Sequence, residues 1–407
     1  MNKTHSEEVA DRVGSSVQRR LVYLSGAPRV STRPDADLAG PRTHVLGVVK
    51  AFEELGWNVE PFIAGDRVPR KWVTNGSEMS VSGGSFRTLV ADLMRVALGP
   101  LNAWRAWREL GGRGGWVYER SAVLQAMGWI FKRDGGPWIL ETNAPLFYEA
   151  KADRNSIVLS GIARWLELRA YRECDVLVCV SEALKEILVR EAGLQPEKVV
   201  VVPNGVDTNF FDPNRYTPMR MFEGFTIGFV GHLSAWQGLD LLLEVLKDLR
   251  AEGIDVSLVV VGDGPMRQAW EAQARRLGIT ANVAFTGRLP QQEVPRLISG
   301  FDVGYSGPVR LNVGKMYLSP LKLYEYMAMA KPPVASTFES IQRVVQHQET
   351  GFLFTSADKA DLRRVLVEAY RSRSVLAEMG RKAREEVVAH HSWTARVRTL
   401  ISEVEHI

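Results

Sequence analysis

The sequence predicts an α/β protein made of two similar domains, each a parallel sheet with helices on both faces, and a last helix that returns to the first domain. Two observations lead to this prediction. Short β-type runs alternate with helix-length segments along most of the 407 residues, and a turn-rich stretch near the middle separates two such series. With 45% hydrophobic and 24% charged residues, the chain can also bury a core in each domain.

The first series, residues 20–203, contains short apolar runs that are typical of buried strands. These expected strands are 21–25, 59–63, 116–118, 138–141, 176–180 and 199–202. Helical patterns lie between them at 44–55, 122–133, 157–172 and 182–191. Because parallel strands are joined through crossover helices, this alternation indicates a parallel first sheet.

The second series, residues 222–390, follows a linker rich in turn residues at 203–218. Its expected strands are 226–230, 256–261, 283–286, 302–305 and 333–336, and its expected helices are 239–252, 266–277, 293–299 and 320–330. The final segment, residues 391–407, has a helical pattern but no strand left in its own domain, so we expect it to cross back to the first domain. Two such domains leave a cleft at the carboxyl ends of both sheets, where open α/β sheets bind ligands.

Charge and cysteine content restrict the class of protein. The 51 Lys and Arg against 47 Asp and Glu give a net charge of +4, which does not indicate a nucleic-acid partner. Cys174 and Cys179 lie in or beside an apolar run, which favours buried thiols in a reducing cytoplasm over a disulfide or a metal pair. The first twenty residues lack the apolar core of a signal peptide, and no later stretch reaches membrane-spanning length. A cytoplasmic protein, soluble or peripheral at the inner face of the plasma membrane, is expected.

The stretch 319–328 predicts a helix whose start can hold a phosphate. Ser319 suits the N-cap and Pro320 suits the first helical position. The amides that follow, together with Lys322 in the first turn, attract anions. One turn further on, Glu325 interrupts an apolar run, and its carboxylate can accept hydrogen bonds from hydroxyls. Phosphate plus vicinal hydroxyls indicates a nucleotide, although an amphipathic helix with one solvated acid explains the same residues equally well.

Several short motifs follow the expected strands of the second series in a fixed order. They are Gly228-Phe229-Val230-Gly231, Gly238-Leu239-Asp240, Val261-Gly262-Asp263-Gly264-Pro265, Val283-Ala284-Phe285-Thr286-Gly287 and Leu323-Tyr324-Glu325-Tyr326-Met327-Ala328. Together they resemble the retaining glycosyltransferases of the GT-B fold, in the large group 1, or family 4, set that contains sucrose-phosphate synthases and bacterial mannosyltransferases. The resemblance covers nearly the whole chain after residue 20 and is stronger in the second half.

The resemblance implies two Rossmann-like domains, the first binding an acceptor and the second a nucleotide sugar, with no metal ion or other cofactor. The expected activity is transfer of the sugar to a glycan, lipid-linked or small-molecule acceptor, as in polysaccharide biosynthesis. Glu325 would bind the ribose hydroxyls, and the backbone at 287–289 would meet the base. The donor-binding residues implied are Gly231, His232, Gln237, Gly264, Arg288, Leu289, Leu321, Lys322 and Glu325. A nucleotide-sugar-binding protein without turnover and a GT-B epimerase acting on the nucleotide sugar stay open as alternatives.

This chain departs from the family pattern at three positions. The family usually carries a second glutamate eight positions before Glu325, and here that position is Tyr317. Two positions that are commonly cationic in the family are His232 and Gln237 here. We expect Lys322 and the helix amides to compensate, helped by one of two cations in the preceding loop, Arg310 or Lys315. Ordinary solvation of the two loop side chains is the alternative.

The first domain offers candidates of its own. In relatives, a histidine just after a central strand contacts the transferred sugar, and Asn143 stands at the matching place. Asn143, Glu141 and Lys322 are therefore the catalytic candidates, with capping of the next turn as the alternative role for the first two. Arg42 and His44 follow a long loop and are candidates for contact with the acceptor or the donor phosphate. Packing at a helix start is the alternative for His44.

Residues 86–110 form a basic helical pattern that carries Trp104 and Trp107. Such a helix can lie on an anionic bilayer, which would suit a lipid-linked acceptor. A surface helix with both tryptophans in the protein core is the expected alternative.

Overall fold

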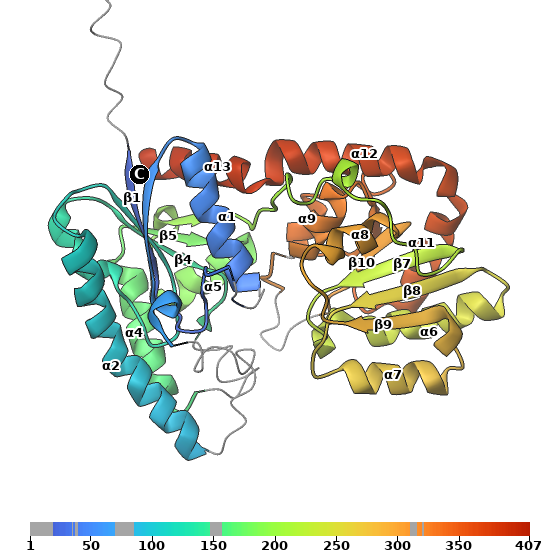
Figure 1. Cartoon of the computed structure of the whole chain (residues 1–407), viewed down its shortest axis with the longest axis horizontal. Coiled ribbons are helices and arrows are strands. Elements are labelled where there is room, and N and C mark those ends of the chain that lie inside the picture. The colour runs from blue at the N-terminus through green and yellow to red at the C-terminus, as the bar shows by residue number, and fades with distance from the viewer. Residues whose placement is uncertain are drawn as a thin grey trace, which may run out of the picture.

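The computed structural model describes residues 19–34, 36, 40–69, 85–146, 157–309, 316–319 and 321–407. These residues form two parallel six-stranded sheets, with strand orders β2-β1-β3-β4-β5-β6 and β12-β11-β10-β7-β8-β9. Helices cover both faces of each sheet (Figure 1). The predicted fold class, two α/β domains with a C-terminal helix shared between them, is therefore confirmed.

The first sheet has its strands close to the expected positions. They are β1 (Arg20–Ser25), β2 (Asn58–Ile63), β3 (Trp116–Arg120), β4 (Trp138–Thr142), β5 (Val176–Cys179) and β6 (Val199–Val201). The helices around it are α1 (Gly40–Glu54), α2 (Ser85–Leu110), α4 (Ser160–Glu173) and α5 (Glu182–Ala192). Every described residue of β4 and β5 is buried, because these central strands have helices on both sides.

The helix expected at 122–133 is wrong: only a 3-10 segment, η3 (Gly128–Asp134), forms there. The buried Glu119 carboxylate accepts hydrogen bonds from the amides of Met127 and Gly128, at 2.7 and 2.8 Å. It also accepts one from the indole of Trp138, at 3.0 Å. These contacts hold the segment against the sheet in a conformation other than an α-helix, and the sequence pattern does not reveal them.

The second sheet also follows the prediction and adds a strand, β12, that the sequence did not indicate. Its strands are β7 (Phe225–Val230), β8 (Val256–Val261), β9 (Val283–Gly287), β10 (Val303–Ser306), β11 (Pro333–Ser336) and β12 (Phe352–Phe354). Its helices are α6 (Leu239–Ala251), α7 (Arg267–Arg276), α8 (Glu293–Ser299), α9 (Leu321–Ala328), α10 (Glu339–Gln342), α11 (Lys359–Arg371) and α12 (Leu376–Glu386).

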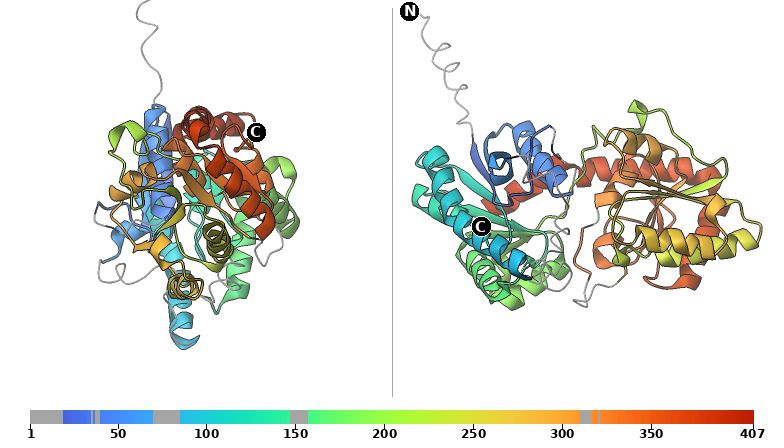
Figure 2. Two further views of the ribbon diagram at one scale, coloured as in Figure 1. Left: turned by 90° about the vertical axis from the view of Figure 1, so that its right-hand side faces the viewer. Right: turned by 60° about the horizontal axis from the view of Figure 1, so that its bottom comes forward.

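The end of the chain joins the two domains. After α12 and a π-helical segment (Val387–His391), α13 (Trp393–Glu405) runs across to the first domain and packs on α1 (Figures 1 and 2). Trp393, Val397 and Leu400 share a buried cluster with residues of α1 and β1. The Ser392 hydroxyl caps α13 by accepting from the amide of Ala395, at 3.2 Å.

We expect substitution of Gly47 on α1 to loosen this contact. A Cβ atom at Gly47 would lie 2.3 Å from Nε1 of Trp393, so the indole must move. Gly47→Ala should lower the free energy of unfolding by about 1–3 kcal/mol, measured by denaturant or thermal unfolding. The matched control is Gly161→Ala on α4, where nothing lies within 4 Å of the added atom, and which should be neutral or stabilising. Equal stability of the two variants would contradict the expected clash.

Both cysteines are buried and unpaired, as expected, and burial raises the pKa of each thiol to about 12. Within the described ranges, no helix is both long and apolar enough to cross a membrane. No group of three His, Cys, Asp or Glu side chains that could hold a metal ion is found in the same part of the chain.

Candidate functional site

Three glycine turns at the carboxyl ends of β7, β8 and β9 lie against one another. Gly231, Gly262 and Gly287 all have positive φ angles, of 143°, 130° and 73°. A Cβ at Gly262 would lie 2.0 Å from the carbonyl oxygen of Gly231, so the close contact requires glycine. Hydrogen bonds of 2.9 Å from the Gly231 amide to the Val261 carbonyl and from the Gly262 amide to the Gly287 carbonyl fix the turns. The result is a compact row of partly buried backbone turns at the carboxyl ends of the strands, where a ligand is expected.

Two further glycines complete this row. A Cβ at Gly264 would lie 2.6 Å from the carbonyl oxygen of Leu233, which explains the glycine in the β8 turn. Gly238 precedes α6 with a φ angle of 69°, and a Cβ there would lie 2.3 Å from the carbonyl oxygen of Gly307. The hydroxyl of Tyr305 donates to the Gly238 carbonyl, at 2.9 Å, and holds this turn to the end of β10.

Helix α9 is held against the same row of turns by Tyr326. Its hydroxyl accepts from the amide of Val230 at 2.8 Å and donates to the carbonyl of Tyr305 at 3.3 Å. The ring lies over Gly304, where a Cβ would lie 2.3 Å from it. Any larger residue at that point of β10 would push the helix away. The start of α9 is therefore fixed beside the turn that follows β7.

The Lys322 ammonium lies beside Gln237, one of the two positions at which the resemblance implies a cation. Its Nζ donates to Oε1 of Gln237 and lies 4.1 Å from the centre of the Phe229 ring. A Cβ on Gly231 would lie 3.5 Å from the same Nζ. Gln237 is buried, and its amide nitrogen donates to the carbonyl of His232 at 3.3 Å. Gln237 thus bonds both to Lys322 of α9 and to the backbone of His232, the other residue that departs from the family pattern.

Burial shifts the ionisation of Lys322 and Glu325 in opposite directions. Both side chains are partly covered by protein. Loss of solvent lowers the pKa of Lys322 to about 7 and raises the pKa of Glu325 to about 7, and each charge partly offsets the shift of the other. Acidic and basic groups whose pKa values are shifted strongly toward neutral pH are typical of a ligand site. An arriving anion would favour the charged form of Lys322.

Ser319 does not have the expected role of N-cap for α9. Its hydroxyl accepts from the amide of Asn204 at 3.1 Å and lies 3.3 Å from the hydroxyl of Tyr324. The Asn204 side chain in turn donates to the Ser319 carbonyl, at 3.0 Å. These bonds join α9 to the interdomain linker. Pro320, Arg310 and Lys315, for which roles were predicted, lie outside the described residues.

Tyr317 is an interdomain anchor. Its side chain is fully buried within the core of the first domain, and its carbonyl accepts from the hydroxyl of Ser181 at 2.7 Å. The position that carries a glutamate in the family is therefore occupied by a packing residue. Arg396 on α13, which donates to the Asn204 carbonyl at 3.4 Å, is another junction contact that the sequence did not indicate.

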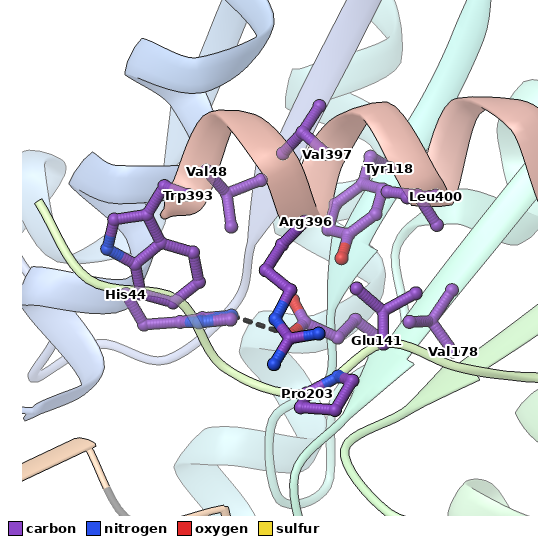
Figure 3. A pocket seen from close by; sticks show the side chains of 11 residues that line it. His44, Val48, Tyr118, Glu141, Val178, Pro203, Trp393, Arg396, Val397 and Leu400 are labelled. Atoms are coloured by element: carbon purple, nitrogen blue, oxygen red, sulfur yellow. Dashed lines mark ion pairs between the residues drawn. The ribbon is translucent and has the colours of Figure 1, made fainter. Parts of the chain in front are cut away.

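The structure brings Glu141 and His44 together, but in a small pocket lined by residues of α13. Oε1 of Glu141 lies 2.5 Å from Nε2 of His44, and both side chains are buried. Figure 3 shows Trp393 and Arg396 over this pair, and the pocket lining includes neither Lys322 nor Glu325. Burial raises the pKa of Glu141 to about 7, and burial together with the nearby Arg120 lowers the pKa of His44 well below its ordinary value, so the imidazole is neutral at neutral pH.

Asn143 and Arg42 have contrasting surroundings. Oδ1 of Asn143, beyond the end of β4, is buried and has no hydrogen-bond partner among the described residues. The guanidinium of Arg42 is buried, and it donates to the carbonyls of Ser31 and Arg33 at 3.1 and 2.9 Å. Arg42 therefore organises the loop after β1, whereas the Asn143 amide keeps an unused acceptor.

The starts of α1 and α9 face each other across the domain junction. A Cβ at Gly40 would lie 3.8 Å from Cδ1 of Leu321, the first residue of α9. Both helices thus direct their N-terminal amides toward one interdomain region. Of the predicted base contacts, Arg288 is exposed and Leu289 is half-buried beside Val230 and its cluster.

Comparison with known proteins gives matches over both domains. The family model described as glycosyl transferases group 1 matches residues 224–372, and the model described as Glycosyltransferase Family 4 matches residues 39–210. A 2-deoxystreptamine glucosyltransferase of Streptomyces kanamyceticus is 29% identical over 154 residues, which are 36% of this chain. The chain spans only 39% of that relative's length.

Two solved structures share the whole fold. HepE from Anabaena, in complex with UDP and glucose, aligns with a TM-score of 0.64 and 16% identity over 96% of this chain and 100% of its own. A sucrose-phosphate synthase from Thermosynechococcus elongatus aligns with a TM-score of 0.66 and 15% identity over 95% of this chain and 99% of its own. At this identity the likeness establishes the two-domain fold.

Proposed function

The chain belongs to the group 1, family 4 glycosyltransferases of the GT-B fold, and on this premise we propose that it transfers a sugar, with retention of configuration, from a nucleoside diphosphate sugar. The acceptor is proposed to be a glycan, a lipid-linked sugar or a small molecule. The observation that carries the proposal is the position of the Lys322 ammonium, one helical turn before Glu325, beside the Gly231 turn at the end of β7 and bonded to Gln237.

In the proposed donor complex the diphosphate lies between the Gly231 turn and the first amides of α9, next to the Lys322 ammonium. The absence of a side chain at Gly231 supports this, because backbone amides can then approach the phosphate. Glu325, one turn further along α9, accepts from the ribose hydroxyls. The backbone at 287–289 meets the base, with Gly264 leaving room beside it. We propose UDP as the first nucleotide to test, since HepE holds it.

We propose that catalysis depends on placement and on charge at the leaving group. As the bond from the sugar to the diphosphate breaks, negative charge grows on the leaving oxygen, and Lys322 with the α9 amides stabilises it. That oxygen takes the proton of the acceptor hydroxyl on the same face of the sugar, so the pair of carboxylates needed by glycosidases is unnecessary. The unused acceptor of Asn143 supports a contact with a hydroxyl of the transferred sugar.

The remaining first-domain candidates have positioning roles in this proposal. Glu141 and His44 are covered by α13, so they support the end of β4 that carries Asn143. Arg42 holds the loop after β1, whose residues can then line the acceptor side. A cytoplasmic location stays a prediction from the sequence.

The experiment that tests the proposal is a donor panel. Purified protein is incubated with UDP-, GDP- and ADP-sugars, and nucleotide release is measured with and without simple glycosides as acceptors. We expect one donor to be hydrolysed or transferred and Glu325→Ala to lose this turnover. Tyr317 in place of the family's first glutamate favours a second candidate, binding without turnover, which binding of a donor with no product would support. Conversion of a donor with no acceptor and no nucleotide release would identify an epimerase instead.

A further inference from the structure

Helix α2 exposes an apolar stripe and buries an acid near its middle, although its last turns pack Ala103, Ala106 and Leu110 into the first-domain core. Asp92, near its middle, is completely buried, whereas Phe86 is 77% exposed and Trp104 is 47% exposed. The exposed apolar side chains recur at helical spacing along one side: Phe86, Val90, Leu93, Met94, Leu101 and Trp104. Surface helices normally turn such a stripe toward the protein core. The expectation that both tryptophans of this helix are in the core is therefore wrong for Trp104, while Trp107 packs against the first-domain core.

The start of α4 extends the same surface. The buried Asp92 carboxylate accepts from the amides of Val158 and Leu159, at 2.7 and 3.0 Å, and so fixes α4 beside α2. The two helices lie side by side at the outer edge of the first domain (Figures 1 and 2). The exposed apolar residues of α2 and α4 together form what we call the α2–α4 face: Phe86, Val90, Leu93, Met94, Leu101, Trp104, Val158, Ile162 and Trp165.

Positive charge borders this apolar surface. The two helices contain seven arginines, four on α2 and three on α4, against two acids on each helix. Three of the arginines are ion-paired with acids: Arg95 with the buried Asp92 at 2.9 Å, Arg164 with Glu191 at 3.2 Å and Arg169 with Glu173 at 2.7 Å. The guanidinium of Arg108 lies 5.3 Å from the ring centre of Trp104, and that of Arg169 lies 5.3 Å from the ring centre of Trp165. Each helix thus carries an exposed tryptophan with an arginine one turn away.

We propose that the α2–α4 face docks on the surface of an anionic lipid bilayer. Exposed apolar side chains can enter the boundary between headgroups and acyl chains, tryptophan suits the headgroup level, and arginine binds the lipid phosphates. A second copy of the chain fits less well, because a two-fold contact through this face would bring its arginines toward the same arginines of the partner. The inference is independent of the proposed reaction, since it depends only on the outer surface of the first domain.

The test is flotation of the full-length protein with vesicles. We expect binding to vesicles of phosphatidylcholine and phosphatidylglycerol, little binding to phosphatidylcholine alone, and release as salt increases. The double variant Trp104→Ser and Trp165→Ser should lower the bound fraction at least about fivefold. The matched control is Met221→Ser with Val375→Ser, which removes two exposed apolar side chains from the second domain and should bind as the parent does.

Two results would overturn the proposal. One is failure of the parent protein to float with anionic vesicles, or unchanged binding by the double tryptophan variant, when both proteins show the same thermal unfolding. The other is sedimentation velocity that finds a dimer which the tryptophan variant dissociates, because the face would then be the contact between two copies.

Discussion

Glu325→Ala is expected to weaken donor binding by about 100-fold or more. The half-buried carboxylate is proposed to accept two hydrogen bonds from the ribose. Hydrogen bonds to a charged group contribute about 1.5–3 kcal/mol each, so losing both costs about 3 kcal/mol, which corresponds to about two factors of ten in the dissociation constant. Titration calorimetry with the nucleoside diphosphate measures this directly, without requiring the acceptor to be known.

The control for this variant is Glu325→Gln, which keeps the shape and one acceptor oxygen but removes the charge. Its affinity should lie between those of the parent and Glu325→Ala. Since burial raises the pKa of Glu325 from its ordinary value to about 7, the folded protein loses stability as pH rises between these two values, and the whole loss is present at pH 8 in the empty protein. Both variants should therefore unfold at the same or a higher temperature than the parent at pH 8. Weakened binding together with a lower unfolding temperature would point to damaged folding instead of a lost ligand contact.

Lys322→Met is expected to reduce kcat by about 100- to 1,000-fold, the range seen when one preorganised group that stabilises developing negative charge is removed. Donor affinity should fall less, because the amides of α9 and the glycine turns remain. Methionine has nearly the length of lysine, so the change removes the ammonium, with its hydrogen bond to Gln237 and its contact with the Phe229 ring, and leaves most of the volume of the side chain. Steady-state kinetics with the donor found in the panel separates kcat from KM.

Lys331→Met is the matched control for Lys322→Met. Burial also lowers the pKa of Lys331, yet this lysine follows the far end of α9 and interacts with Asp302 and Arg220. Its removal should leave kcat near the parent value. Equal losses in the two variants would mean that replacing any buried lysine of this region disturbs the fold, and the assignment of Lys322 to the leaving group would be wrong.

The pH dependence of donor affinity separates the two charges. In the empty protein the pKa values of Lys322 and Glu325 are both about 7. The diphosphate favours the ammonium, so affinity should fall as pH rises above 7, and the ribose favours the carboxylate, so affinity should fall as pH drops below 7. The expected profile is a bell with its maximum near pH 7. Lys322→Met should remove the alkaline limb and shift the acidic limb to higher pH, and Glu325→Gln should remove the acidic limb and shift the alkaline limb to lower pH, because each charge partly offsets the shift of the other.

Much of the fold could be predicted because parallel strands buried on both faces are continuous apolar runs, which the sequence displays without ambiguity at 226–230 and 256–261. The glycines at the strand ends were equally visible. Gly262 has to be glycine because of its close contact with the Gly231 carbonyl, so this local requirement is visible in the sequence as a glycine. The prediction of a helix at 122–133 failed because a single buried acid, Glu119, holds this segment through hydrogen bonds to the amides of Met127 and Gly128. Such contacts leave no periodic pattern in the sequence.

The sequence alone determined that Lys322 and Glu325 lie on one helix start, since residues three apart on a helix are neighbours. Only the tertiary structure decided that the Lys322 ammonium bonds to Gln237, 85 positions away in the sequence. It also decided that Tyr317 is buried in the core of the first domain. The same holds for α2, whose pattern has two distinct sides but does not say which one faces inward. The burial of Asp92 against the amides of Val158 and Leu159, just before α4, decided that. Hydrophobic periodicity shows that a helix or strand has two different sides. What each side contacts depends on how the rest of the chain packs around it.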